Sequence, residues 1–111
     1  MSRGRKSQEF AATYLQTVFK EAAPIAASLP GKDILNTPGW AFEVKARREF
    51  LPTQWSKQMT KNELPDEYSA CIMRPDGYGE AKVGEWLVFM TFKEFRSLVE
   101  TLEFYKREYE D

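Results

Sequence analysis

The spacing of apolar and polar positions changes several times along the chain, and each change marks a new element. Apolar residues recur every three or four positions in three segments, which predicts amphipathic helices over 8–20, 52–61 and 92–109. Alternating segments rich in aromatic and branched side chains predict strands at 33–35, 40–47, 68–74 and 85–90, and a short extended segment lies near 25–29. The predicted order is therefore helix, two or three strands, helix, two strands, helix, which is a mixed α/β arrangement.

Turn and capping signals set the boundaries of these elements. The segment Asn36–Gly39 is typical of a turn, and it is expected to join 33–35 to 40–47 as a hairpin. Ser7 is a candidate cap for the first helix, behind a basic arm at 1–7. The last helix follows a capping-box pattern and carries an apolar stripe that we expect to be buried. This stripe consists of Phe92, Phe95, Leu98, Val99 and Leu102.

The central strand carries the most informative polar side chains. Period-two alternation places Trp40, Phe42 and Val44 on one face and Glu43 and Lys45 on the other. Charged side chains are rarely buried without partners, so an acid and an amine on one face of an apolar strand indicate a site. A second acid, Asp33, precedes Glu43 by ten residues and lies at the start of the predicted hairpin.

Composition narrows the chemistry that such a site can perform. The 111 residues are enough for one domain, and 42% hydrophobic with 14% aromatic residues predicts a globular, soluble chain. No apolar run approaches the length of a membrane span, and the N-terminus lacks an apolar export signal, so we expect a cytoplasmic protein. Without histidine, a Ser-His or Cys-His pair is excluded, and a zinc site is nearly so. The lone Cys71 is interpreted as a small core residue, which leaves carboxylates and amines for catalysis.

Charge is distributed unevenly although the formal net charge is only −1. Residues 1–62 sum to +5 and residues 63–111 to −6. This asymmetry fits a basic face for an anionic partner, and it fits ordinary solvated surface equally well.

The pattern Asp33-x9-Glu43-x-Lys45, with a helix before it and a helix after it, resembles the PD-(D/E)xK nuclease superfamily. Within that superfamily the chain is similar to small phage Holliday-junction-resolvase-like endonucleases over about residues 5–105. The resemblance implies a restriction-endonuclease-like core in a single nuclease domain, 1–111. Such a core is a mixed sheet of four to five strands flanked by helices, in the order α-β-β-β-α-β-β-α. The proline that often directly precedes the aspartate in this family is displaced here to Pro30, followed by Gly31 and Lys32.

The resemblance also implies the roles of individual residues. It makes Asp33, Glu43 and Glu9 metal ligands for Mg²⁺ or Mn²⁺, and it adds Lys45 and Gln58 to the catalytic group. Each role has a structural alternative. Asp33 would be a turn residue, Glu43 a solvated strand residue and Lys45 an exposed strand residue. Glu9 would be a glutamate that interacts with the helix dipole. Ser28 is a weaker candidate for a hydroxyl near the site.

Phosphate contacts are expected from basic residues distributed over the N-terminal half, and no base-reading motif is present. The resemblance implies a metal-dependent DNA endonuclease that cuts Holliday junctions or other branched DNA as a homodimer, in the host cytoplasm if it is phage-encoded. The alternative is a non-catalytic nucleic-acid-binding or assembly module that keeps the nuclease fold. The candidate nucleic-acid-binding residues are Arg3, Arg5, Lys6, Lys32, Arg47, Arg48 and Lys57.

Overall fold

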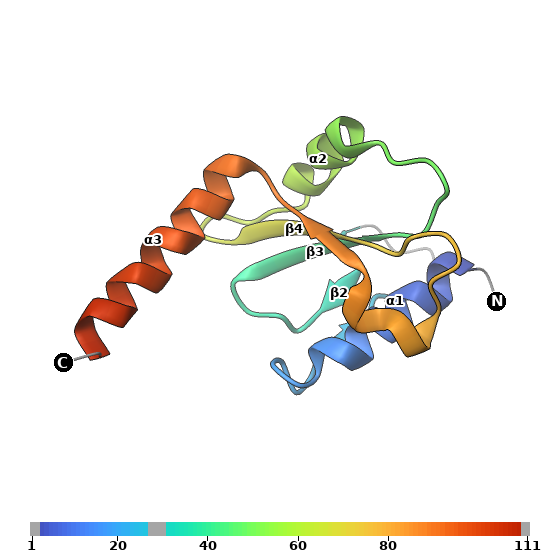
Figure 1. Cartoon of the computed structure of the whole chain (residues 1–111), viewed down its shortest axis with the longest axis horizontal. Helices are drawn as coiled ribbons and strands as arrows, with labels where there is room; N and C mark the ends of the chain where they lie inside the picture. The colour runs from blue at the N-terminus through green and yellow to red at the C-terminus, as the bar shows by residue number, and fades with distance from the viewer. Residues whose placement is uncertain (1–2, 27–30, 110–111) are drawn as a thin grey trace.

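The computed structural model describes residues 3–26 and 31–109 (Figure 1). It is a mixed α/β fold, as predicted, and a 3₁₀ helix, η1, is an additional element before the last strand. The elements in chain order are α1 (Arg3–Leu15), β1 (Ala23–Pro24), β2 (Ile34–Leu35), β3 (Trp40–Lys45), α2 (Pro52–Lys61), β4 (Tyr68–Met73), η1 (Glu80–Glu85), β5 (Leu87–Phe89) and α3 (Phe92–Tyr109).

The strands form two sheets rather than the single sheet of four to five strands that was expected. β3 pairs with β4 in parallel and β4 pairs with β5 antiparallel, while β1 and β2 form a separate antiparallel pair. Asn36 directly after β2 has a positive φ of 65°, which is not an extended conformation, so β2 ends at Leu35. The small sheet has two residues on each strand.

The predicted hairpin between β2 and β3 is replaced by a looser connection. The turn itself is present, because the Trp40 N–H donates to the Thr37 carbonyl oxygen at 3.0 Å and Gly39 has a φ of 85°. The ladder partner of β2, however, is β1, and it is Asp33, just before β2, whose N–H donates to the Phe42 carbonyl oxygen at 3.1 Å. Asp33 thus contacts the free edge of β3 without forming a strand pair.

The two faces of the three-stranded sheet carry separate cores, and α1 and α2 lie on opposite sides of it (Figure 1). Phe42 and Val44 pack with Ala11 and Ala12 of α1, as the alternation predicted. The other face packs against α2 through Trp55, Met59, Cys71 and Met73. In the parallel register Glu43 lies beside the fully buried Cys71, so Glu43 faces α2 and the prediction of Cys71 as a core residue is confirmed.

α1 begins and ends about five residues earlier than its apolar pattern predicted. Residues 3–7 belong to the helix, so the described part of the basic segment is not an arm. Ser7 is fully buried inside the helix and accepts a hydrogen bond from Arg74 Nη1 at 3.0 Å, so it is not the cap. The reason is tertiary: the Arg74 guanidinium lies over the rings of Phe10 and Trp86 and requires a buried acceptor.

α3 differs most from expectation, because no residue between Phe92 and Tyr109 is buried. Eighteen helical residues span about 27 Å, and a three-stranded sheet is too narrow to cover them. Figure 1 shows the helix leading away from the sheet. The Thr91 hydroxyl accepts the Glu94 N–H at 3.2 Å as a cap should, but the Glu94 carboxylate accepts the Ser69 N–H at 2.6 Å and anchors only the first turn. Among the described residues, no helix has the length and apolar character that crossing a membrane requires.

Candidate functional site

Asp33 is held at the edge of β3 by its backbone and its side chain together. β4 occupies one edge of β3, so Phe42 and Val44 direct their backbone groups to the other edge. The Asp33 N–H donates to the Phe42 carbonyl oxygen, and Asp33 Oδ2 accepts the Val44 N–H at 2.7 Å. The carboxylate thus takes the place of a backbone carbonyl that a neighbouring strand would have supplied. This double attachment fixes its position relative to β3.

Glu43 lies next to this carboxylate in an environment that disfavours its charge. The residue is only 4% exposed, on the face of β3 that meets α2. Burial, and then the negative charge of the adjacent Asp33, raise the pKa of Glu43 from 4.5 to about 7. Glu43 Oε1 accepts a hydrogen bond from Asn62 Nδ2 at 2.7 Å, and this contact and Lys45 offset part of the effect. Beneath the pair, burial raises the pKa of the Cys71 thiol to about 12, so this thiol stays protonated.

Lys45 and Gln58 are joined by a hydrogen bond. α2 begins at Pro52, as predicted, and buries Trp55 and Met59 against the sheet. This anchoring places Gln58 where its Oε1 accepts a hydrogen bond from Lys45 Nζ at 2.7 Å. The structure therefore brings four of the five expected catalytic residues into one group, Asp33, Glu43, Lys45 and Gln58.

Glu9 lies on α1, the helix that covers the other face of the sheet. Its carboxylate pairs with Arg5 at 3.7 Å. Within 3–26 and 31–109, no three acidic, cysteine or histidine side chains are grouped closely enough to hold a metal ion. The structure thus does not bring Glu9 to Asp33 and Glu43 as a third ligand. Ser28 lies outside the described residues.

The chemistry of the Asp33 and Glu43 pair nevertheless fits a hard divalent cation. Mg²⁺ is commonly held by one or two carboxylates, with waters and substrate phosphates completing its coordination. A cation would also offset the repulsion that raises the pKa of Glu43. Two adjacent carboxylates are therefore sufficient protein ligands for such an ion.

Asn62 and Lys61 are site residues that the sequence analysis missed. Asn62 follows Gln58 by four positions, and it ends α2 with its side chain directed to Glu43. Residues four apart on a helix share a face, so the spacing from Gln58 was a usable signal. Lys61 follows Lys57 by the same interval. The end of α2 thus contributes more to the site than Gln58 alone.

A basic groove lies beside the carboxylate pair. It has a volume of about 550 Å³ and no acidic lining residue. Arg47, Lys57 and Lys61 are exposed in it, and none of the three forms an ion pair within the described part of the chain. Unpaired cations around one groove favour a polyanionic ligand. The groove is lined by Lys45, Arg47, Gln54, Trp55, Lys57, Gln58 and Lys61.

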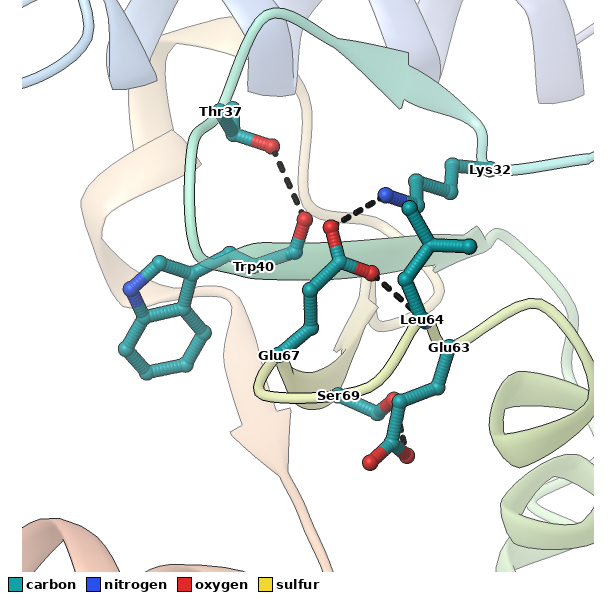
Figure 2. A network of polar contacts seen from close by, with 7 residues as sticks. All are labelled: Lys32, Thr37, Trp40, Glu63, Leu64, Glu67 and Ser69. Atoms are coloured by element: carbon teal, nitrogen blue, oxygen red, sulfur yellow. Dashed lines mark hydrogen bonds and ion pairs between the residues drawn. The ribbon is translucent and has the colours of Figure 1, made fainter.

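The remaining basic candidates lie elsewhere or are engaged within the protein. Lys32 forms an ion pair with Glu67, whose other carboxylate oxygen accepts the Leu64 N–H at 2.8 Å (Figure 2). This contact ties the segment before β2 to the loop before β4. Arg48 pairs with Asp76 at 3.5 Å on the surface, and Arg5 donates to the Ile25 carbonyl oxygen. Lys6 is exposed on α1, and Arg3 begins that helix.

No protein-family model, curated protein or solved structure matches the chain. A functional assignment therefore depends on the arrangement of these side chains and on the chemistry they can perform.

Proposed function

We propose that this protein is a metal-dependent endonuclease that hydrolyses phosphodiester bonds in DNA at Holliday junctions or other branched structures, on a restriction-endonuclease-like core. The main support is the adjacent pair of carboxyl groups, Asp33 and Glu43, of which Glu43 has a pKa raised to about 7. Holding the buried carboxylate of Glu43 beside the partly buried carboxylate of Asp33 is costly unless a cation or a proton joins them. Structural needs alone do not explain such a pair, and a cation-dependent activity does.

Asp33 and Glu43 would hold Mg²⁺ or Mn²⁺, and Glu9 is not needed for this role. When bound there, a divalent ion would supply Lewis-acid polarisation of the scissile phosphate and a lower pKa for a water molecule. The Val44 N–H fixes the Asp33 carboxylate and the Asn62 amide fixes that of Glu43, so both ligands are oriented before any substrate arrives.

Lys45 would place its ammonium group where negative charge develops on the phosphate during attack. Its hydrogen bond to Gln58 at 2.7 Å holds the flexible side chain in one position. Gln58 is therefore a positioning residue for Lys45. The amide N–H groups of Gln58 can also donate hydrogen bonds to a phosphate oxygen.

The basic groove would bind the DNA backbone next to the cleavage site. Arg47, Lys57 and Lys61 line the same groove as Lys45, so a strand bound in the groove would meet several cations. Phosphate contacts of this kind position the backbone without reading base sequence. Recognition of branched DNA shape, by two copies that each cut one strand, fits such contacts.

A cleavage assay tests the proposal directly. Labelled four-way junction, linear duplex and single strand are incubated with Mg²⁺, Mn²⁺ or EDTA, using the wild type and Asp33→Asn. Asparagine keeps an oxygen that can accept the Val44 N–H, so this change removes charge while it preserves the fold. Asp66→Asn, in an exposed loop away from the groove, is the matched control.

We expect metal-dependent cutting that Asp33→Asn abolishes and Asp66→Asn retains. If no substrate is cut with either metal, the nuclease proposal is wrong, and if Asp33→Asn still cuts, the site is wrong. Binding without cleavage would identify the alternative, a nucleic-acid-binding module. That alternative is favoured by the low formal net charge of −1 and by the acidic second half of the chain.

A further inference from the structure

α3 presents a continuous apolar stripe to solvent. Its members are separated by three or four residues, so they lie along one side of the helix. Their exposed fractions range from 38% to 83%. Packing of the apolar side supplies most of a helix's stability in proteins, and a continuous exposed apolar stripe marks an interaction surface. The α3 stripe consists of Phe92, Phe95, Val99, Leu102, Tyr105 and Tyr109.

A concave apolar surface begins where this stripe meets the sheet. This apolar groove has a volume of about 710 Å³, and all of its lining residues are apolar. β3, β4 and β5 form its floor, and Phe92, Phe95 and Leu98 of α3 form one wall. The N-terminal half of the stripe therefore lines the groove, while its C-terminal half extends beyond the body of the protein (Figure 1). Val18, Phe19, Trp40, Phe42, Val88 and Met90 are among the other lining residues.

We propose that the α3 stripe and the apolar groove form one interface between two copies of this chain. In this dimer the two α3 helices pack antiparallel around a two-fold axis near Val99 and Leu102. That arrangement places Tyr109 of one copy level with Phe92 of the other, because both residues lie the same number of positions from the axis. The projecting half of each stripe then covers the groove of the partner, which satisfies both apolar surfaces at once.

The area available matches what a stable dimer needs. A buried aromatic side chain removes about 150–250 Å² from solvent; the stripe has four aromatic and two aliphatic residues, 38% to 83% exposed, and therefore offers on the order of 700 Å² per copy. A standard specific interface buries about 800 Å² per partner, and the groove residues supply the remainder. The stripe and groove together therefore account for an interface of ordinary size.

Charge does not oppose the pairing of two α3 helices. Outside the stripe, α3 has four basic and four acidic side chains, so its net charge is zero. Two ion pairs are already formed within the helix, Arg96 with Glu100 at 3.2 Å and Lys106 with Glu103 at 3.4 Å. A second copy can thus approach without repulsion, and the dimer does not depend on the carboxylate site or on any nuclease activity.

Sedimentation of the full chain from about 1 to about 300 µM tests the proposal, with the wild type expected to reach twice the monomer mass of 12.9 kDa. Leu102→Glu places a charge in the stripe, and Phe104→Glu places one on the opposite side of the same helix. Both residues are about half exposed, at 52% and 57%, so neither change should unfold the protein. We expect Leu102→Glu to weaken dimerisation at least about 100-fold, because symmetry repeats the loss in both copies. Phe104→Glu should leave it unchanged.

A second pair of variants tests the groove separately. Val88 lines the groove, whereas its strand neighbour Leu87 does not, and their exposures are similar at 60% and 55%. Val88→Glu should weaken the dimer about as much as Leu102→Glu does, and Leu87→Glu should not. Circular dichroism and melting temperature confirm that each variant is folded.

Three results would overturn the inference. The first is a wild-type protein that stays monomeric over the whole concentration range. The second is an equal effect of Leu102→Glu and Phe104→Glu on dimerisation, which would show that the stripe is not part of the interface. The third is a folded Val88→Glu protein that dimerises as the wild type does, which would show that the groove is not part of the interface.

Discussion

At the scale of single residues, the environment of Glu43 links protonation to stability. Because the folded pKa of about 7 lies above the ordinary 4.5, the folded state holds a proton that the unfolded chain has already released. This contribution is fully present below pH 4.5 and is lost as the pH rises through about 7. The difference corresponds to at most about 3 kcal/mol of unfolding free energy.

Urea unfolding in EDTA, from pH 5 to pH 8, measures this loss. We expect the wild type to lose stability relative to Glu43→Gln as the pH rises, because glutamine can accept the Asn62 hydrogen bond but does not titrate. Replacing EDTA with Mn²⁺ at pH 8 should restore the unfolding free energy of the wild type and leave that of Glu43→Gln unchanged. Parallel pH profiles for the two proteins would contradict the assigned environment of Glu43.

Asn62 offers a second test at this scale. Its amide donates to Glu43 Oε1 at 2.7 Å, and groups that orient a metal ligand typically affect metal affinity by about 10–100-fold. Asn62→Ala should therefore weaken Mn²⁺ binding by about that factor, measured by calorimetry. Thr60→Ala is the control, since among the described residues the Thr60 hydroxyl donates to carbonyl oxygens of its own helix and not to the site. Equal Mn²⁺ affinities for Asn62→Ala and Thr60→Ala would show that Asn62 does not orient a metal ligand.

The sequence could predict four members of the group, Asp33, Glu43, Lys45 and Gln58, but not Asn62 and not the contacts that hold the group together. Strand alternation is a local property, so the common face of Glu43 and Lys45 followed from spacing. The attachment of Asp33 to Val44 depends on a strand edge left open by the absence of a β2–β3 ladder, and no local pattern specifies that. The burial of Ser7 likewise depends on Arg74, which lies 67 residues away in the sequence.

At the scale of elements, the bounds of α2 were predicted closely and those of α1 were not. Pro52 fixes the start of α2, and Trp55 and Met59 anchor its buried side. α1 has no such marker, and the apolar residues after Leu15 continue its periodicity into a turn. A helical pattern thus located the helix but not its ends.

The exposed side of α2 leads to a prediction about DNA binding. Lys57 and Lys61 line the basic groove, and each phosphate contact contributes about 0.9 to the slope of log affinity against log salt for duplex DNA. In an Asp33→Asn background, which prevents cleavage, Lys57→Gln and Lys61→Gln should each lower that slope by about 1. Lys93→Gln on α3 should not change it. Fluorescence anisotropy over a salt series measures the slopes. Equal slopes for Lys57→Gln, Lys61→Gln and Lys93→Gln would show that DNA does not bind in the basic groove.

At the scale of the whole molecule, α3 shows what an amphipathic pattern can and cannot predict. The spacing of Phe95, Val99 and Leu102 correctly indicated a helix with one apolar side. It did not indicate what covers that side, because coverage depends on the width of the sheet and on other chains. The sheet beside α3 has three strands rather than the expected four to five, and the stripe is exposed.

The proposed dimer and the proposed nuclease together predict how a branched substrate is cut. On a supercoiled plasmid that extrudes a cruciform, a dimer with two sites can cut both strands before it dissociates, which gives linear product. A Leu102→Glu monomer makes one cut at a time, and relaxation after that cut removes the cruciform, so nicked circles should accumulate. Phe104→Glu should match the wild type, because its side chain lies away from the α3 stripe. Gel analysis of the first products distinguishes these outcomes, and linear product from a Leu102→Glu protein that sediments as a monomer would show that paired cutting does not require this dimer.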